Sequence, residues 1–89
     1  MKPIEEMLRK YIADNILFSK DGYPYPDGAS FLENGILDST NILELVMFVE
    51  EEFGITTEDN EIVPGYFDSV RNLSQFVRSK MDSKVGGKI

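Results

Sequence analysis

A repeat of apolar residues between Asp38 and Gly54 constrains the fold of this chain more than any other feature. Apolar side chains recur there three and four residues apart, at Ile42, Leu45, Val46, Val49 and Phe53. This spacing puts them on one side of an α-helix, where they can be buried together. Asp38 and Ser39 carry oxygens that can cap the free N–H groups of a first turn, and a glycine commonly follows the last turn. The sequence therefore predicts a helix over residues 39–53.

Three further segments complete the prediction. Residues 3–15 carry apolar side chains at helical spacing behind a proline, which suits the first turn of a helix. Residues 64–67 predict a short helical turn, and residues 69–82 a last helix capped by Asp68 or Ser69. No segment shows the two-residue alternation of a strand. The predicted fold is all-α, a small four-helix bundle with three longer helices and a short third one.

A long first loop connects the first two predicted helices. Residues 16–34 are rich in turn residues, and each proline disfavours helix in the residue before it. Tyr23 and Tyr25 in this loop either cover the core or form an aromatic pair that binds a partner. We expect five apolar side chains to hold the loop against the helices: Ile16, Leu17, Phe18, Phe31 and Leu32.

The composition excludes several kinds of chemistry. The chain contains no Cys, His or Trp, so it has no disulfide, no thiolate or imidazole metal ligand and no histidine base or cysteine nucleophile. The acidic connection over residues 54–64 lacks the ligand spacing of a calcium-binding loop, so we expect no metal site. Residues 1–82 are predicted to form one domain, and residues 83–89 a flexible C-terminal tail.

The net charge of −7 is distributed unevenly. No Lys or Arg lies between Asp21 and Val70, and all nine basic residues lie outside that window. An acidic surface disfavours nucleic acid and favours basic partner proteins, although it can also serve solubility alone. No apolar run reaches the roughly 20 residues of a membrane span, and the N-terminus lacks the apolar segment of a signal peptide. We therefore expect a cytoplasmic protein.

The residues around Ser39 resemble a known family. The frame Ala-Ser-Phe-Leu-Glu-Asn-Gly-Ile-Leu-Asp-Ser, which ends at Ser39, looks like the phosphopantetheine attachment motif of acyl carrier proteins. Residues 43–47 and 50–53 resemble the recognition helix that follows this motif in the family, and the resemblance extends over residues 3–80. Ser69 also follows an Asp but lacks the frame, so we expect it to be a helix cap.

The resemblance implies a covalent modification. A phosphopantetheinyl transferase would use coenzyme A and a magnesium ion to attach 4′-phosphopantetheine to Ser39. Asp38 matches the family's residue beside the serine, which is associated with recognition by the transferase and with the metal-assisted step. The helix N-terminus would favour the resulting phosphodiester. The thiol of the arm would then carry acyl or aminoacyl groups as thioesters, so the protein would be a carrier and not an enzyme.

The resemblance also implies a face for partner enzymes. The residues that match it are Glu44, Met47, Glu50 and Glu51, together with Thr40 at a position where the family usually has Leu. The implied partners are the phosphopantetheinyl transferase and the ligases, synthases or transferases that load and use the carrier. Each would have a basic docking surface. We expect the protein to be a monomer. The alternative is an unmodified acidic helical adaptor that binds a basic protein, which would not need the intact frame at Ser39.

Overall fold

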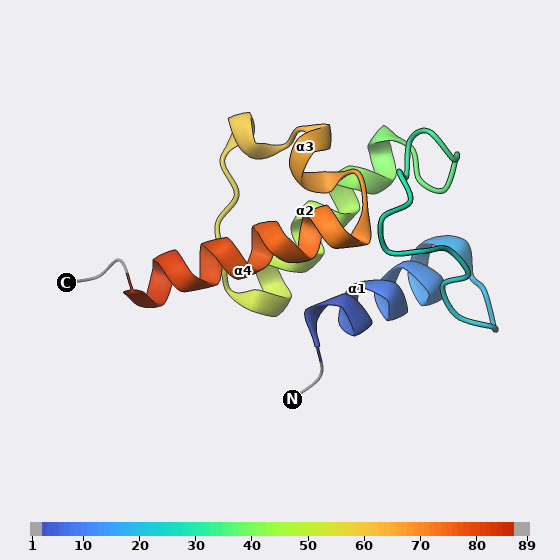
Figure 1. Cartoon of the computed structure of the whole chain (residues 1–89), viewed down its shortest axis with the longest axis horizontal. Helices are drawn as coiled ribbons and strands as arrows, with labels where there is room; N and C mark the ends of the chain where they lie inside the picture. The colour runs from blue at the N-terminus through green and yellow to red at the C-terminus, as the bar shows by residue number, and fades with distance from the viewer. Residues whose placement is uncertain (1–2, 87–89) are drawn as a thin grey trace.

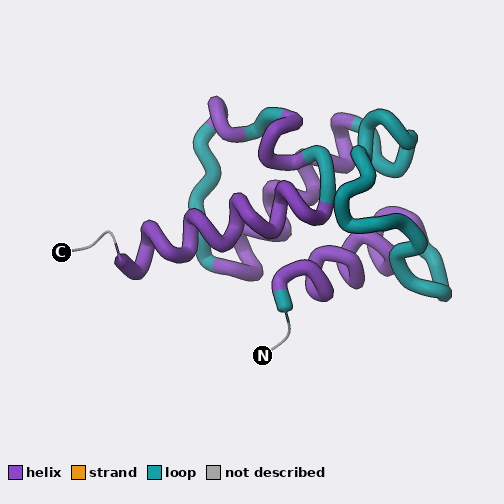
Figure 2. Tube along the Cα trace, in the orientation of Figure 1, coloured by secondary structure: helices purple, strands orange, loops and turns teal. Residues whose placement is uncertain are grey.

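The computed structural model describes residues 3–86, which form helices joined by loops and contain no strand, as Figure 2 shows. The prediction of an all-α fold with three longer helices and a short one is confirmed. Figure 1 shows α1 and α4 side by side, with α2 behind α4 and α3 beside its start. None of the described helices is long and apolar enough to cross a membrane. The elements are α1 (Ile4–Ile12), the π-helical turn η1 (Ala13–Leu17), α2 (Ser39–Phe53), the 3₁₀ turn η2 (Asp59–Glu61), α3 (Pro64–Phe67) and α4 (Val70–Gly86).

The first helix is longer than the prediction of residues 3–15. The π-helical turn extends it to Leu17, and Phe18 ends it in a left-handed conformation with φ of 52°. The N–H of Ser19 then donates to the carbonyl of Ala13 at 2.8 Å, which closes the helix end. Because the chain changes direction at Phe18, the phenyl ring leaves the buried stripe and is 78 % exposed. The prediction that Phe18 holds the loop against the helices is wrong.

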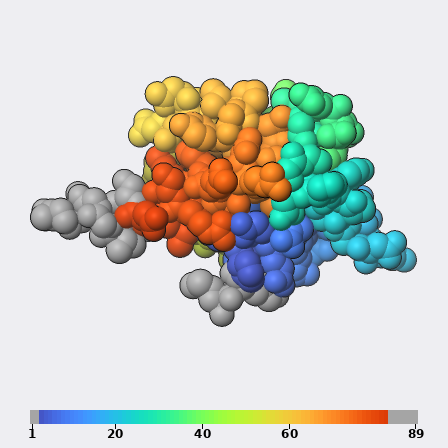
Figure 3. Space-filling view, viewed as in Figure 1, coloured from blue at the N-terminus to red at the C-terminus, as the bar shows by residue number. Residues whose placement is uncertain are grey.

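The long first loop, which spans residues 18–38 in the structure, packs along the start of α4, as the space-filling view in Figure 3 shows. Phe31 is fully buried, as predicted, whereas Leu32 is exposed because it lies on the outer side of the turn that buries its neighbour. Tyr23 meets Phe31 edge to face, with ring centroids 6.5 Å apart, and its burial raises the pKa of its hydroxyl to about 12. Tyr23 therefore covers the core, and Tyr25 packs against its outer side.

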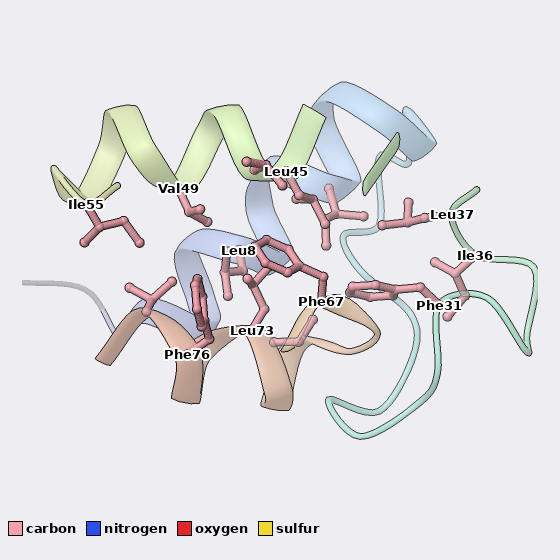
Figure 4. Packing of buried hydrophobic residues seen from close by; sticks show 14 residues of the cluster. Leu8, Phe31, Ile36, Leu37, Leu45, Val49, Ile55, Phe67, Leu73 and Phe76 are labelled. Carbon is pink, nitrogen blue, oxygen red and sulfur yellow. The ribbon is translucent and has the colours of Figure 1, made fainter. Parts of the chain in front are cut away.

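The core draws on every α-helix and on the first loop (Figure 4). Burial of these apolar side chains is the main force that holds such a small domain together. The loop contributes as much as a helix does, because three of its residues are buried with the helical stripes. The buried residues include Leu8 and Ile12 of α1, Phe31, Ile36 and Leu37 of the loop, Leu45 and Val49 of α2, Phe67 of α3, and Leu73 and Val77 of α4.

The last helix begins at Val70 and continues to Gly86, four residues beyond its predicted end at residue 82. Apolar periodicity marks the residues of a helix that can be buried, and a helix can extend past the last of them. The flexibility predicted for residues 83–89 stays a prediction, and residues 87–89 lie outside the described residues.

Candidate functional site

Ser39 is the first residue of α2. The N-terminus of this helix is capped by two reciprocal hydrogen bonds between Asp38 and Asn41. The Asn41 N–H donates to Asp38 Oδ1 at 2.9 Å, and the Asp38 N–H donates to Asn41 Oδ1 at 3.2 Å. This reciprocal pair is a capping box in which Asn replaces the usual Glu or Gln. The Asn41 amide also donates to Glu44 Oε1 at 2.9 Å. Asp38 is the predicted cap, whereas Asn41 was not predicted, although its place three residues after Asp38 could have indicated its role.

The chain before Ser39 is buried, whereas Asp38 and Ser39 themselves are exposed. Ile36 and Leu37 are both in the core. Gly35 adopts a left-handed conformation with φ of 64°, which a glycine adopts without strain. The frame Gly-Ile-Leu-Asp-Ser thus has a physical meaning: a turn, two anchors, a cap and an accessible hydroxyl.

An apolar groove of about 280 Å³ lies beside Ser39. It runs between the first half of α2 and the segment that contains α3, and the first loop closes one side. Ser39 and Asp68 are the polar residues that line it. The other lining residues are Leu32, Ile42, Leu43, Ile62, Val63, Pro64 and Phe67. An apolar groove beside an exposed hydroxyl can accommodate an apolar group attached to that hydroxyl.

Four of the five residues predicted to face partners are exposed on α2: Thr40, Glu44, Met47 and Glu51. They are separated by four, three and four residues, so they form one stripe along the helix. Glu50 differs, because it is half-buried and its Oε2 accepts the Thr57 N–H at 2.9 Å. The structure therefore uses Glu50 to hold the connection after α2.

Two neighbours of this face were not predicted. Leu43 is 55 % exposed beside the groove, although it belongs to a run of mostly apolar residues in this helix. Its offset from the buried stripe and its spacing of four from Met47 could have indicated exposure. Tyr11 of α1 stacks on Phe48 with ring centroids 4.1 Å apart. Burial, together with the Glu44 and Glu51 carboxylates, raises the pKa of its hydroxyl, so α1 borders the acidic stripe.

The second Asp-Ser pair has a structural role. Ser69 is buried, and its Oγ accepts the Asn72 N–H at 3.0 Å at the start of α4. The prediction that Ser69 is a helix cap is confirmed, whereas Asp68 binds the first loop instead. Within residues 3–86, no group of three or more carboxylates is arranged to hold a metal ion.

Comparison with known proteins gives a consistent family. The chain is 37 % identical over 60 residues to acyl carrier proteins of Sinorhizobium fredii and Rhizobium meliloti, a match covering 67 % of this chain and 74 % of each relative. It is 40 % identical over 58 residues to an acyl carrier protein of Nitratidesulfovibrio vulgaris, covering 65 % of this chain and 74 % of that protein. No protein-family model matches the chain.

Proposed function

The chain belongs to the acyl carrier protein family and is therefore a carrier for biosynthetic enzymes, not an enzyme; from this premise we propose that it holds acyl or aminoacyl groups as thioesters on a 4′-phosphopantetheine arm attached to Ser39. The observation that carries the proposal is the exposed hydroxyl of Ser39 at the N-terminus of a 15-residue helix, beside an apolar groove. The arm supplies a thiol, which a chain without cysteine lacks.

The residues around Ser39 fit a phosphodiester. The first turn of α2 contains no acidic residue, and its N–H groups and helix dipole favour a negative charge there. Asp38 is engaged in the capping box, which orients this turn. The apolar lining of the groove suits the hydrocarbon part of an acyl group, because contact with it removes apolar surface from water.

Modification of Ser39 needs a second protein. A serine hydroxyl is a weak nucleophile until a base removes its proton, and within the described residues no side-chain base is hydrogen-bonded to Ser39. We assign that base to a phosphopantetheinyl transferase, which would use coenzyme A and a magnesium ion. The partner enzymes would dock through basic surfaces on the exposed stripe of Thr40, Glu44, Met47 and Glu51, with Leu43 beside it. The monomeric state and the cytoplasmic location stay predictions.

The test is the intact mass of the protein after incubation with coenzyme A, Mg²⁺ and a broad-specificity phosphopantetheinyl transferase. We expect a gain of one phosphopantetheine, its loss in Ser39→Ala, and its retention in Ser69→Ala. The second variant is a matched control, because it removes the other serine that follows an aspartate. No gain in the wild type, under conditions that modify a known carrier, would instead support the unmodified adaptor.

A further inference from the structure

Asp68 connects the end of α3 to the loop that leads into Ser39. Its Oδ2 accepts a short hydrogen bond from the hydroxyl of Ser30, a residue 38 positions earlier in the chain. Its Oδ1 accepts the Leu32 N–H at 3.0 Å, and its backbone carbonyl accepts the Phe31 N–H at 2.7 Å. One residue thus holds three consecutive residues of the loop.

The loop residues that Asp68 holds determine the path of the chain toward Ser39. The Ser30 hydroxyl oxygen accepts the Glu33 N–H at 3.0 Å, which tightens the turn. The Phe31 carbonyl accepts the Ile36 N–H at 2.8 Å. These bonds return the chain to the core immediately before the exposed Asp38–Ser39 pair, so the turn over residues 30–37 acts as the support of the site.

The surroundings of Asp68 suit this role. Its side chain is half-buried and lines the same groove as Ser39. Among the described residues Asp68 has no ion pair, so its carboxylate is held by hydrogen bonds from Ser30 and Leu32. The two bonds join segments that are 36 and 38 positions apart in the chain.

We infer that Asp68 is a positioning residue for the modification of Ser39, because it holds the turn over residues 30–37 and thereby fixes the orientation of the Asp38–Ser39 pair. The inference rests on the proposed modification of Ser39. A transferase that meets a hydroxyl in one fixed place loses less entropy in reaching the geometry of phosphoryl transfer. Loosening the turn therefore slows the chemical step more than it weakens docking.

The experiment measures the steady-state kinetics of a phosphopantetheinyl transferase with this protein as the varied substrate. For Asp68→Ala we expect kcat/KM to fall about tenfold, mainly through kcat, because the exposed stripe of α2 is unchanged. Ser30→Ala removes one of the bonds, and we expect a loss of about threefold. Asp68→Asn retains an acceptor for Leu32 and a polar group for Ser30, and we expect it to stay within about twofold of the wild type.

Amide hydrogen exchange gives a readout that does not depend on turnover. In Asp68→Ala we expect faster exchange of the Phe31, Leu32 and Ile36 amides. The matched control is Glu5→Gln, which breaks the pair that Glu5 makes with Arg78 between α1 and α4. Arg78 lies about 12 Å along the α4 axis from Val70, where α4 begins, so this control acts away from Asp68. This control is expected to lower the melting temperature without changing kcat/KM.

Two results would overturn the inference. The first is unchanged kinetics in Asp68→Ala and Ser30→Ala beside a lowered melting temperature, which would make the connection purely structural. The second is Asp68→Asn as slow as Asp68→Ala, which would show that the charge acts and not the positioning. If Asp68→Ala does not fold, the kinetics of Ser30→Ala alone test the inference. Failure of the wild type to be modified would instead remove the proposed function and, with it, this inference.

Discussion

The ion pairs of the molecule and the hydrogen bonds around Ser39 stabilise different regions in different ways. Every ion pair among the described residues takes its base from α1 or α4, as in the pair of Arg78 with Glu5, whose atoms approach to 2.7 Å. Around Ser39, the capping box of Asp38 and the bonds of Asp68 join side chains and backbone without a basic residue. Leu43 and Met47 of α2, the helix that begins at Ser39, are exposed.

The difference explains how a small acidic protein can be both stable and available to partners. The four bases that form ion pairs, Arg9, Lys10, Arg78 and Lys80, all pair with acids outside α2, and Glu44 and Glu51 of α2 have no basic partner in the described part of the chain. Such unpaired acids beside exposed apolar side chains suit transient contact with a basic surface. If this division holds, substitutions in the core, in the acidic stripe, at the cap of α2 and in an ion pair should have effects that decrease in that order.

Phe31 belongs both to the core and to the turn before Ser39, and its loss is expected to have the largest effect on stability. Its ring is fully buried and its backbone supports the turn before Ser39. Phe31→Ala should lower the free energy of unfolding by about 3–5 kcal/mol, measured by urea denaturation. Leu32→Ala is the control, because the exposed neighbour should change stability by less than about 0.5 kcal/mol. Similar losses in the two variants would contradict the placement of Phe31 in the core and of Leu32 at the surface beside the groove.

Charge reversal on α2 should affect partner use without affecting the fold. Glu44→Lys combined with Glu51→Lys should lower kcat/KM for transfer from a partner enzyme by about tenfold at low salt, and the loss should shrink as the ionic strength rises. Circular dichroism should be unchanged. Glu50→Gln is the control, because Glu50 is half-buried and its carboxylate accepts a hydrogen bond from the Thr57 N–H. If transfer kinetics stay unchanged in the double variant, the acidic stripe is not a docking surface.

The cap of α2 should contribute a moderate amount to stability. Asp38→Ala removes the acceptor of the Asn41 N–H and should cost about 1 kcal/mol of unfolding free energy. Asp38→Asn keeps an acceptor at the cap and should recover most of that loss, as thermal melts can show. A full loss in both variants would mean that the negative charge at the helix start stabilises the protein, not the hydrogen bond.

The pair of Glu5 and Arg78 should have the smallest effect, and one that depends on pH. The hydrogen bond from Arg78 lowers the pKa of Glu5 from 4.5 to about 2 in the folded protein. The pair therefore stabilises the fold fully above pH 4.5, and this contribution is lost as the pH falls toward 2. Because solvent screens the pair, it should be worth less than about 1 kcal/mol.

The measurement is the difference in melting temperature between the wild type and Glu5→Gln across that range. The difference should be present at neutral pH and vanish near pH 2. A difference that persists at the lowest pH would assign the effect to side-chain packing and not to ionisation.

Much of this architecture follows from local pattern. The bounds of α2, its cap at Asp38 and its ending glycine could all be read from residues a few positions apart, because helical periodicity and capping are local properties. The same holds for the all-α fold and for Ser69 as a cap. The exposure of Ser39 is also local, since the buried pair of Ile36 and Leu37 ends just before it.

The helices, the exposed serine and the acidic window follow from the sequence alone, because each depends on neighbours in the chain. Contacts between side chains that are far apart in the chain depend instead on the tertiary structure. Asp68 binds a loop 36 and 38 positions away, and Glu50 turns to Thr57 instead of to solvent. Leu43 is exposed because the groove remains open beside it. Such contacts depend on how the helices pack, and the spacing of residues along the chain does not contain that information.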